Sequence, residues 1–316
     1  MKLLVIASSD FVPLSRLATV GGVTVTAGTE AAGLEEAIVD ADAILIAPRY
    51  GAILRDLLPR ARHLRWIHAL GAGIETLPFD LFRQSDVVVT NSAGVYADAL
   101  SEFAIAAMLY FAKDLRQLVE NQCAKRWAPF TVERLEGKSV GIIGYGGIGR
   151  AIGRRAAAMG MNVLATRRGG PIDDGIVSES FAVDRLDELL GRSDYVAISA
   201  PLTSSTRGLI NERRLSLMKR EAVLVNVSRG AIVDEHALIR VLRRKEIRGA
   251  ALDVFQFEPL RSSSPLWNLD NVLLSPHSAD RTSDSHDRAM TFYLENLTRF
   301  RSGEPLRNIV DKEAEY

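Results

Sequence analysis

The stretch SVGIIGYGGIGRAIGRRAAAMGMNVLATRR, residues 139–168, decides the fold of this chain. A short apolar run, Val140 to Ile143, leads directly into the turn Gly144-Tyr145-Gly146-Gly147-Ile148-Gly149. A segment with helical spacing, Arg150 to Met159, and a second β-type run, Asn162 to Thr166, come next. Strand, G-x-G-x-x-G turn, helix and strand in this order indicate a dinucleotide-binding unit, whereas a glycine-rich turn alone would indicate little.

The residues of the turn each have a physical role in that interpretation. Gly144 permits the tight turn, Gly146 lets the backbone approach a pyrophosphate, and Gly149 lets the helix pack close to the strand. Gly147 and Ile148 complete the turn, and the N-terminus of the helix that follows offers N–H groups and a positive partial charge to the phosphates.

Composition bounds the class of protein. The 316 residues suffice for two domains, and 47% apolar with 25% charged residues is typical of a globular protein. The 39 Lys and Arg balance the 39 Asp and Glu, so nothing predicts a nucleic-acid or anionic-membrane partner. Cys123 is the only cysteine, which excludes disulfides and cysteine-based metal sites, and we predict no metal. No apolar stretch has the length of a membrane span, so we expect a cytoplasmic enzyme or binding protein.

Short apolar runs alternate with helical or loop segments, which predicts parallel, doubly wound α/β sheets. Gly33–Val39 and Ala52–Leu58 have apolar spacing suited to helices. Five runs before the glycine turn are predicted strands: Leu3–Ala7, Val23–Thr26, Ala43–Ala47, Trp66–Leu70 and Val87–Thr90. Four more follow it: Tyr195–Ala200, Ala222–Val227, Ala250–Phe255 and Asn271–Leu274. With the two strands of the opening stretch these four give six, the number expected of a dinucleotide-binding sheet.

The segment Asp98–Val119 is the longest uninterrupted helical pattern and is apolar around most of its circumference. A helix of this kind is buried. Joining two domains and packing against a second subunit would both bury it, so we predict a homodimer.

The end of the second strand of the opening stretch bears on the choice of cofactor. Dinucleotide enzymes usually place an acid there to hold the ribose 2′-OH. This chain has Thr166-Arg167-Arg168 instead, and the next carboxylate is Asp173. Two guanidiniums and a hydroxyl bind a 2′-phosphate through charge-assisted hydrogen bonds, whereas an acid would repel it. We therefore favour NADP(H); the alternative is that the arginines lie on a solvated turn and the enzyme uses NAD(H).

Arg229, Glu258 and His277 each follow one of the last three predicted strands. Because the carboxyl ends of parallel strands meet at one edge, all three would lie on the side of the glycine turn. An arginine can orient a 2-keto acid, a histidine can donate a proton to the carbonyl oxygen, and a paired acid favours the protonated imidazole. The set predicts reduction of a 2-keto acid, although each residue alone could be an ordinary ion-pair or structural residue.

Loops after the first strands are candidate ligand surfaces. Arg49-Tyr50-Gly51, Leu70-Gly71-Ala72-Gly73 and Asn91-Ser92-Ala93-Gly94 each follow a predicted strand, but each alone could equally be a plain turn. We expect structural roles for the remaining histidines, of which His68 is the least certain because it precedes the second loop. The other three are His63, His236 and His286.

These motifs together resemble the D-isomer-specific 2-hydroxyacid dehydrogenases over nearly the whole chain, most strongly over residues 135–279. In that family the glycine turn is followed by N-V-[SA]-R-G, here Asn226–Gly230, by L-D-V-F…E-P, here Leu252–Pro259, and by P-H, here Pro276-His277.

The resemblance implies a role for each site residue. Arg229 would bind the substrate, His277 would be the acid/base and Glu258 its partner. The loop Leu70–Gly73 would hold the substrate carboxylate through backbone N–H groups. Arg49-Tyr50-Gly51 would form a second substrate-side loop, in which Tyr50 differs from the expected residue and leaves the substrate open. The resemblance also implies cofactor contacts. Asp253 and the Val227 backbone would hold the nicotinamide carboxamide, and Pro201 and Thr206 would line the cofactor groove.

The family fold implies a Rossmann NAD(P)-binding domain, residues 99–280, inserted into a flavodoxin-like substrate domain made of residues 1–98 and 281–316. Arg167 in place of the usual acid is similar to glyoxylate/hydroxypyruvate reductases, and Glu258 stands where formate dehydrogenases carry an amide, which argues against formate oxidation. The expected partner is a small 2-keto or D-2-hydroxy acid. Phosphite dehydrogenases, which share the Arg–Glu–His set, and corepressor-like nucleotide sensors of the same fold are the alternatives.

Overall fold

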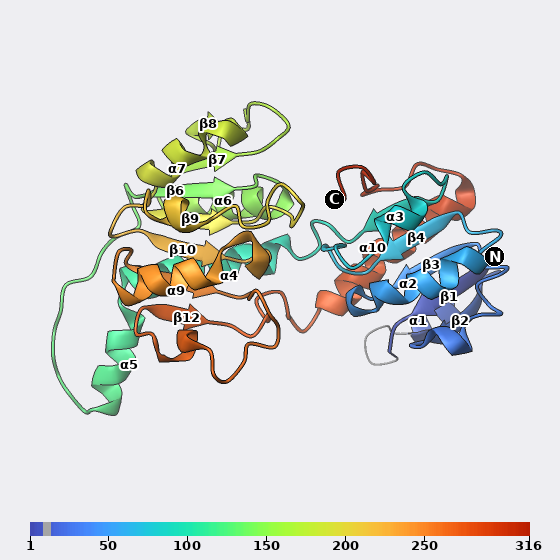
Figure 1. The fold of residues 1–316 in the computed structure, drawn as a ribbon, viewed down its shortest axis with the longest axis horizontal. Coiled ribbons are helices and arrows are strands. Elements are labelled where there is room, and N and C mark those ends of the chain that lie inside the picture. Colours follow the sequence, from blue (N-terminus) through green and yellow to red (C-terminus); the bar gives the residue numbers. More distant parts are fainter. Residues whose placement is uncertain (9–13) are drawn as a thin grey trace. The chain divides into compact units, whose positions relative to one another are not determined.

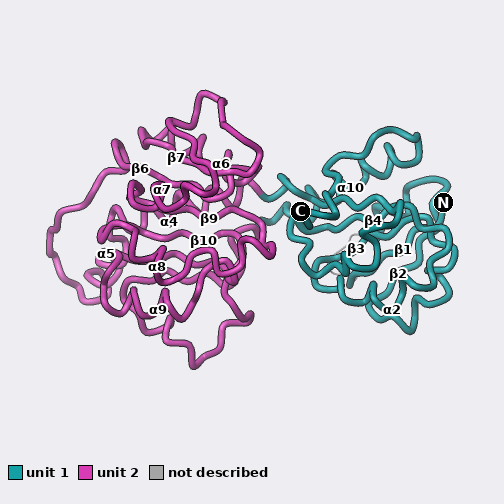
Figure 2. Tube along the Cα trace, turned by 45° about the horizontal axis from the view of Figure 1, so that its top comes forward, with its two compact units in different colours: residues 1–96, 282–316 teal, residues 97–281 magenta. Residues whose placement is uncertain are grey.

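The computed structural model describes residues 1–8 and 14–316, which form two compact units. Unit 1 consists of Met1–Tyr96 and Thr282–Tyr316, and unit 2 consists of Ala97–Arg281 (Figure 2). The chain crosses between the units twice, so unit 2 is an insertion into unit 1.

Unit 1 is built on a five-stranded parallel sheet with the order β2-β1-β3-β4-β5 (Figure 1). This is the 2-1-3-4-5 order of flavodoxin-like folds, and it confirms the doubly wound sheet predicted from the alternating apolar runs. The central strands β3 and β4 are buried on both faces, which is why their sequences are almost continuously apolar. The strands are β1 (Lys2–Ile6), β2 (Thr24–Gly28), β3 (Ala43–Ile46), β4 (Trp66–Ala69) and β5 (Val88–Asn91).

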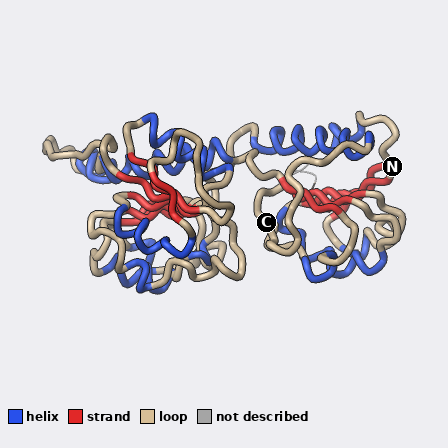
Figure 3. The backbone as a smooth tube through the Cα atoms, turned by 90° about the horizontal axis from the view of Figure 1, so that it is seen from above, coloured by secondary structure: helices blue, strands red, loops and turns tan. Residues whose placement is uncertain are grey.

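Helices cover both faces of this sheet (Figure 3). On one face the long helix α10 (Ser285–Ser302) packs Met290, Tyr293 and Leu297 into the core cluster that contains Trp66. The opposite face is covered by short helical segments. The other helical elements of unit 1 are α1 (Leu14–Ala18), η1 (Ala31–Gly33), η2 (Pro48–Ile53), α2 (Leu54–Leu57), η3 (Leu58–Arg60) and α3 (Phe79–Phe82).

Two helix predictions in unit 1 need correction. Residues 33–39 form the end of η1 and a series of turns, because a glycine at the start and two β-branched residues at the end weaken helix formation. Residues 52–58 are helical as predicted but are divided among η2, α2 and η3. Pro59, which has no N–H to donate, stands at the point where α2 would otherwise continue.

Unit 2 is built on a seven-stranded parallel sheet with the order β12-β11-β10-β9-β6-β7-β8. It confirms the predicted Rossmann-type sheet but has one strand more than the six predicted, because β8 (Glu179–Phe181) pairs beside β7. Only Phe181 of β8 is buried, so this strand has no apolar run that could reveal it. The other strands are β6 (Ser139–Ile143), β7 (Asn162–Thr166), β9 (Tyr195–Ile198), β10 (Val223–Asn226), β11 (Gly249–Leu252) and β12 (Val272–Leu274).

The segment Asp98–Val119, predicted as one helix, forms two: α4 (Ala97–Ala112) and α5 (Leu115–Cys123). Asp114 interrupts it with a φ of 46°, in the left-handed region, and its side chain accepts a hydrogen bond from Gln117 N–H at 3.3 Å that caps α5. The other helical elements of unit 2 are α6 (Gly147–Ala158), η4 (Val183–Arg185), α7 (Leu186–Arg192), α8 (Glu212–Leu215), η5 (Gly230–Ile232), α9 (Glu235–Arg243) and η6 (Pro265–Asn268).

Over residues 1–8 and 14–316, no helix combines the length and the apolar character that a membrane crossing requires. In the same ranges no cluster of three or more His, Cys, Asp or Glu side chains could hold a metal ion. Cys123 is exposed at the end of α5.

Candidate active site

Parallel pairing brings the carboxyl ends of the unit 2 strands to one edge of the sheet. β10, β11 and β12 are direct neighbours there, and Arg229, Glu258 and His277 lie in the three loops that follow them. The glycine turn follows β6, which belongs to the same parallel sheet. Ligands bind at this edge in open α/β sheets, at the point where the strand order reverses.

His277 and Glu258 form a hydrogen-bonded pair. Nδ1 of His277 lies 2.7 Å from Oε2 of Glu258, and the other carboxylate oxygen accepts a hydrogen bond from Phe255 N–H at 3.0 Å. The backbone of His277 adopts a φ of 52°, in the left-handed region, and its N–H donates to Asp253 O at 2.9 Å. Because Nδ1 is engaged, Nε2 is the ring nitrogen that can exchange a proton with a ligand.

Electrostatics favours the charged form of this pair. The hydrogen bond to Glu258 raises the pKa of His277 above its usual value, although burial and the charge of Arg229 act in the opposite direction. Burial alone would raise the pKa of Glu258, but the hydrogen bonds from His277 and from Phe255 N–H outweigh it and the pKa is lowered. An imidazolium held by a carboxylate is a proton donor.

Asp253, which is 1% exposed, ties together the loop that carries the histidine. Its Oδ1 accepts hydrogen bonds from Ser275 Oγ at 2.6 Å, from Ser278 N–H at 2.9 Å and from Ala279 N–H at 3.0 Å. Sequence reasoning did not single out Ser275. Its only signal is a hydroxyl between an apolar strand and Pro276.

Asn226, which sequence reasoning also missed, shapes the loop that carries Arg229. Its Nδ2 donates to Arg229 O and its Oδ1 accepts from Ser228 N–H, both at 3.1 Å. Arg229 is half-buried, and its charge lowers the pKa of both His277 and Glu258, so the three side chains act on one another. A polar residue that ends an otherwise apolar, buried strand was the available signal for Asn226.

The glycine turn has the geometry of a phosphate cradle. Gly144 adopts a φ of +93°, which residues with a Cβ rarely adopt. A Cβ on Gly149 would lie 2.4 Å from Gly144 O, so only glycine allows α6 to begin this close to the strand. A Cβ on Gly146 would meet no atom within 4 Å, which means that space lies in front of the backbone there.

The residues at this edge fit a dinucleotide. No side chain caps the start of α6, where the N–H groups of Gly147, Ile148 and Gly149 have no intrahelical partner. Thr166 Oγ1, at the end of β7, is buried and has no hydrogen-bond partner in the described part of the chain. A phosphate at the N-terminus of α6 would accept hydrogen bonds from its free N–H groups, and a ribose or 2′-phosphate near the end of β7 would give Thr166 Oγ1 a partner.

Arg167 and Arg168 lie at the end of β7. Arg167 is half-buried and donates to the carbonyls of its own loop, Gly170 O at 3.2 Å and Pro171 O at 2.8 Å. Asp174, a carboxylate further along the same loop, accepts a hydrogen bond from Tyr145 OH at 3.0 Å and two more from backbone N–H groups. Its oxygens are therefore occupied within the protein.

The predicted groove residues lie in loops at the same edge. Thr206 Oγ1 donates to Pro201 O at 2.7 Å and accepts from Thr203 N–H at 2.8 Å, which closes a tight turn after β9. Val227 is buried directly after β10, and its N–H lies 3.3 Å from Ile198 O.

The predicted substrate loops belong to unit 1. Arg49 donates to Tyr50 OH at 2.8 Å and to Ser8 Oγ at 3.2 Å, and its guanidinium lies 4.9 Å from the centre of the Tyr50 ring. Gly51 is buried in the same segment after β3, and Leu70-Gly71-Ala72-Gly73 follows the neighbouring strand β4.

His68 has the environment of a structural residue. It is fully buried in β4, with Nδ1 2.7 Å from Thr90 Oγ1 and Nε2 3.3 Å from Ser92 Oγ. Burial lowers its pKa to about 3. The imidazole is therefore neutral at physiological pH.

Three kinds of comparison relate the chain to known proteins. Residues 105–279 match the family model described as D-isomer specific 2-hydroxyacid dehydrogenase, NAD binding domain. A glyoxylate reductase of Aeropyrum pernix is 37% identical over 271 residues, which cover 82% of this chain and 79% of that protein. A D-3-phosphoglycerate dehydrogenase of Methanocaldococcus jannaschii is 33% identical over 301 residues; the match covers 93% of this chain, and the chain spans only 56% of that relative's length. A solved structure of an NADPH-dependent glyoxylate/hydroxypyruvate reductase from Sinorhizobium meliloti, in complex with NADP and sulfate, has a TM-score of 0.86 at 28% identity and covers 100% of this chain and 99% of that one.

Proposed function

Because the chain belongs to the D-isomer specific 2-hydroxyacid dehydrogenase family, we propose that it is an NAD(P)-dependent oxidoreductase that interconverts a small 2-keto acid and the D-2-hydroxy acid. Glyoxylate and hydroxypyruvate are the first candidate substrates, since they are the substrates named for relatives of this chain. One observation carries the proposal. The hydrogen-bonded pair of His277 and Glu258 stands with Arg229 at the sheet edge that also carries the glycine turn.

In the direction of reduction, each of the three side chains has one task. Arg229 donates parallel hydrogen bonds to the substrate and orients its keto group. His277 gives the Nε2 proton to the keto oxygen as the alkoxide develops, while Glu258 stabilises the imidazolium and fixes the ring through Nδ1. When bound, the nicotinamide cofactor supplies the hydride chemistry. In oxidation the neutral imidazole takes the hydroxyl proton.

A screen of keto acids with both cofactors tests the activity. Glyoxylate, hydroxypyruvate, pyruvate and bulkier aryl and branched keto acids are each offered with NADPH and NADH, and phosphite is offered with NADP⁺ and NAD⁺. Turnover of a 2-keto acid is expected, and His277→Ala should lower kcat by about 10²–10⁴ with unchanged NADPH binding. Turnover of phosphite alone would favour the alternative that the chain is a phosphite dehydrogenase. Absence of all turnover by a protein that binds the cofactor would favour a nucleotide sensor.

NADP(H) is the favoured cofactor in this proposal. Arg167 and Arg168 stand where an acid would hold the ribose, and the carboxylate of Asp174 is engaged by Tyr145. The ratio of kcat/KM with NADPH to that with NADH should therefore exceed one. Arg167→Glu should reverse it, because the new carboxylate repels a 2′-phosphate and accepts the ribose hydroxyl. A wild-type preference for NADH would contradict the assignment.

A second copy of the chain is the proposed macromolecular partner. α4 is packed against α6 and β10 within unit 2, but α5 and the segment after it expose apolar side chains. These are Leu115, Leu118, Val119, Trp127, Phe130 and Val132. Burying them in a homodimer removes them from water. Light scattering should give twice the chain mass of 34.6 kDa, and Trp127→Glu should shift the mass toward the monomer.

A cytoplasmic location is part of the same proposal. The single cysteine provides no disulfide that would call for an oxidising compartment. Fractionation of cells that produce the protein would test the location directly.

A further inference from the structure

The family resemblance gives the substrate carboxylate to the loop Leu70-Gly71-Ala72-Gly73. Three hydrogen bonds from the last residue of β5 and the segment that follows it hold this loop. Tyr96 OH donates to Leu70 O at 2.8 Å. Ser92 N–H donates to Gly71 O at 3.1 Å. Asn91 Nδ2 donates to Ala72 O at 2.9 Å. Three successive carbonyl groups of the loop are thus each bound by a neighbouring segment of unit 1.

Fixing these carbonyls also fixes the N–H groups of the loop. In a planar trans peptide the C=O of one residue and the N–H of the next point in opposite directions. The bonds to the carbonyls of Leu70, Gly71 and Ala72 therefore aim the N–H groups of Gly71, Ala72 and Gly73 away from the residues that bind the carbonyls. No acceptor within residues 1–8 and 14–316 takes a hydrogen bond from these three N–H groups. N–H groups that have no acceptor within the protein can donate hydrogen bonds to an anion.

We propose that Asn91 and Tyr96 are positioning residues for the substrate, which hold the N–H groups of residues 71–73 in the direction of its carboxylate. The inference rests on the proposed function, because it takes from it a 2-keto acid, with its carboxylate, as the substrate. It gives a specific task to Asn91, which the sequence places only in a candidate ligand loop, and to Tyr96, to which no sequence motif assigns a role. Neither side chain needs to touch the substrate.

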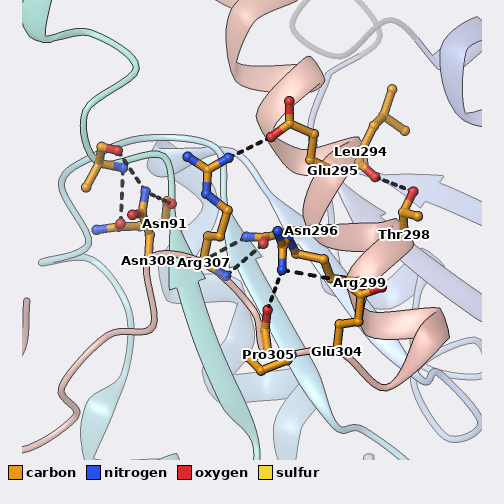
Figure 4. A network of polar contacts seen from close by, with 11 residues as sticks. Asn91, Leu294, Glu295, Asn296, Thr298, Arg299, Glu304, Pro305, Arg307 and Asn308 are labelled. Atoms are coloured by element: carbon orange, nitrogen blue, oxygen red, sulfur yellow. Dashed lines mark hydrogen bonds and ion pairs between the residues drawn. The ribbon is translucent and has the colours of Figure 1, made fainter.

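The amide of Asn91 is itself held in a single orientation. Its Oδ1 accepts from Ala93 N–H at 3.1 Å, so its Nδ2 must face Ala72 O. The side chain of Asn308 donates to Asn91 O at 3.3 Å and to Ala93 O at 2.7 Å (Figure 4). Asn91 is 6% exposed. A positioning residue needs this kind of support, since a side chain that can rotate holds nothing in place.

Two variants remove the hydrogen bonds without changing side-chain size greatly. Asn91→Asp replaces the donor that faces Ala72 O by a second acceptor, and Tyr96→Phe deletes only the hydroxyl that binds Leu70 O. With the keto acid that the wild type turns over best, KM should rise about ten-fold for the first, equivalent to about 1.4 kcal/mol, and about three-fold for the second. The dissociation constant of oxalate from the NADPH complex, measured by calorimetry, should rise in parallel. kcat and the dissociation constant of NADPH should each stay within about two-fold, because a loop that holds the carboxylate equally in ground and transition states affects binding alone.

The chain offers a matched control for each variant. Tyr293→Phe also deletes a tyrosine hydroxyl of unit 1, but this hydroxyl is buried and has no hydrogen-bond partner in the described residues. Asn296→Asp changes an equally buried amide with the same two-sided pattern, since it donates to Arg307 O at 3.0 Å and accepts from Arg307 N–H at 2.9 Å (Figure 4). Both controls should leave KM and oxalate binding unchanged, whatever they do to the melting temperature.

The outcomes separate this inference from the proposed function. A wild type that reduces no 2-keto acid contradicts the proposed function. If the wild type reduces a 2-keto acid, but Asn91→Asp and Tyr96→Phe have the same KM and the same oxalate affinity as the wild type, the positioning role is overturned. An equal loss of affinity in the Asn296→Asp control also overturns it, because the effect would then be general destabilisation. Where Asn91→Asp does not fold, Tyr96→Phe against Tyr293→Phe decides.

Discussion

Replacing Glu258 by glutamine should separate the charge of the pair from its shape. The amide keeps an oxygen that can accept the hydrogen bond from Phe255 N–H, but it removes the negative charge next to His277. The pKa of His277 is raised chiefly by that carboxylate, so it falls in the variant. Reduction needs the protonated imidazole, and therefore the alkaline limb of kcat/KM for reduction should move to lower pH. Oxidation needs the neutral imidazole, so its activity on the acid side should rise.

The contact geometry sets the size of this effect. Nδ1 and Oε2 are 2.7 Å apart, within the range of a charge-assisted hydrogen bond. Such bonds contribute about 1.5–3 kcal/mol, against about 0.5–1.5 kcal/mol for neutral ones. The two side chains are 39% and 35% exposed, so solvent screening favours the low end of the difference, about 1 kcal/mol. Reduction at a pH on the alkaline limb should therefore slow by about five-fold, while the acid plateau stays within about two-fold.

The assay is kcat/KM for keto-acid reduction between roughly pH 5 and pH 10, for wild type and Glu258→Gln. Glu235→Gln is a suitable control, because Glu235 accepts a hydrogen bond from Gln256 N–H at 3.0 Å in the same loop region without contacting the imidazole. An alkaline limb at the same pH in wild type and Glu258→Gln would refute the assignment of His277 as the proton donor paired with Glu258.

Three further predictions concern stability and cofactor binding. Burial lowers the pKa of His68 to about 3, below that of an unfolded histidine, so its contribution to stability is present above about pH 6.5 and is lost as the pH falls. From this group, the free energy of unfolding in urea should be about 2 kcal/mol lower at pH 5 than at pH 7, and His68→Gln should lack this pH dependence. Gly149→Ala places a Cβ 2.4 Å from Gly144 O, so it should weaken NADPH binding more than ten-fold and lower the free energy of unfolding by about 1–3 kcal/mol. An unchanged affinity for NADPH would argue against a close approach of α6 to the glycine turn. Asp114→Ala removes the cap that Gln117 N–H donates to, and it should lower the free energy of unfolding by about 1 kcal/mol with no loss of activity, as measured by urea titration and a steady-state assay.

The sheets of this chain could be predicted because their strands are buried on both faces. Such strands are continuously apolar, so runs like Ala43–Ala47 stand out from the sequence around them. β8 lacks this signal because only one of its three residues is buried. The break between α4 and α5 at Asp114 could not be predicted from the sequence either. The apolar pattern continues across it, and the left-handed turn depends on a single hydrogen bond from the side chain to Gln117 N–H.

Part of the candidate site could likewise be predicted from the sequence, and part of it could not. Arg229, Glu258 and His277 could be singled out because residues with reactive side chains follow directly on apolar strands, at the edge where parallel sheets bind ligands. Asn91 and Asn226 lie in a candidate loop and in a family motif, but their roles could not be predicted, because these roles consist of hydrogen bonds to backbone carbonyls. Sequence shows the side chain that donates such a bond but not the carbonyl that receives it.

The charges at the site favour one direction of proton transfer. Glu258 raises the pKa of His277 and has a lowered pKa itself, so of the two side chains it is the imidazole that holds a proton more tightly. Reduction of a keto acid uses that proton directly, whereas oxidation must first remove it against the attraction of the carboxylate. Arg229 opposes this bias, because its positive charge lowers the pKa of His277. A substrate carboxylate that binds Arg229 offsets the charge of the guanidinium and weakens that opposition. In the proposed reaction, binding of a keto acid at Arg229 would therefore raise the pKa of His277 until the developing alkoxide takes the proton.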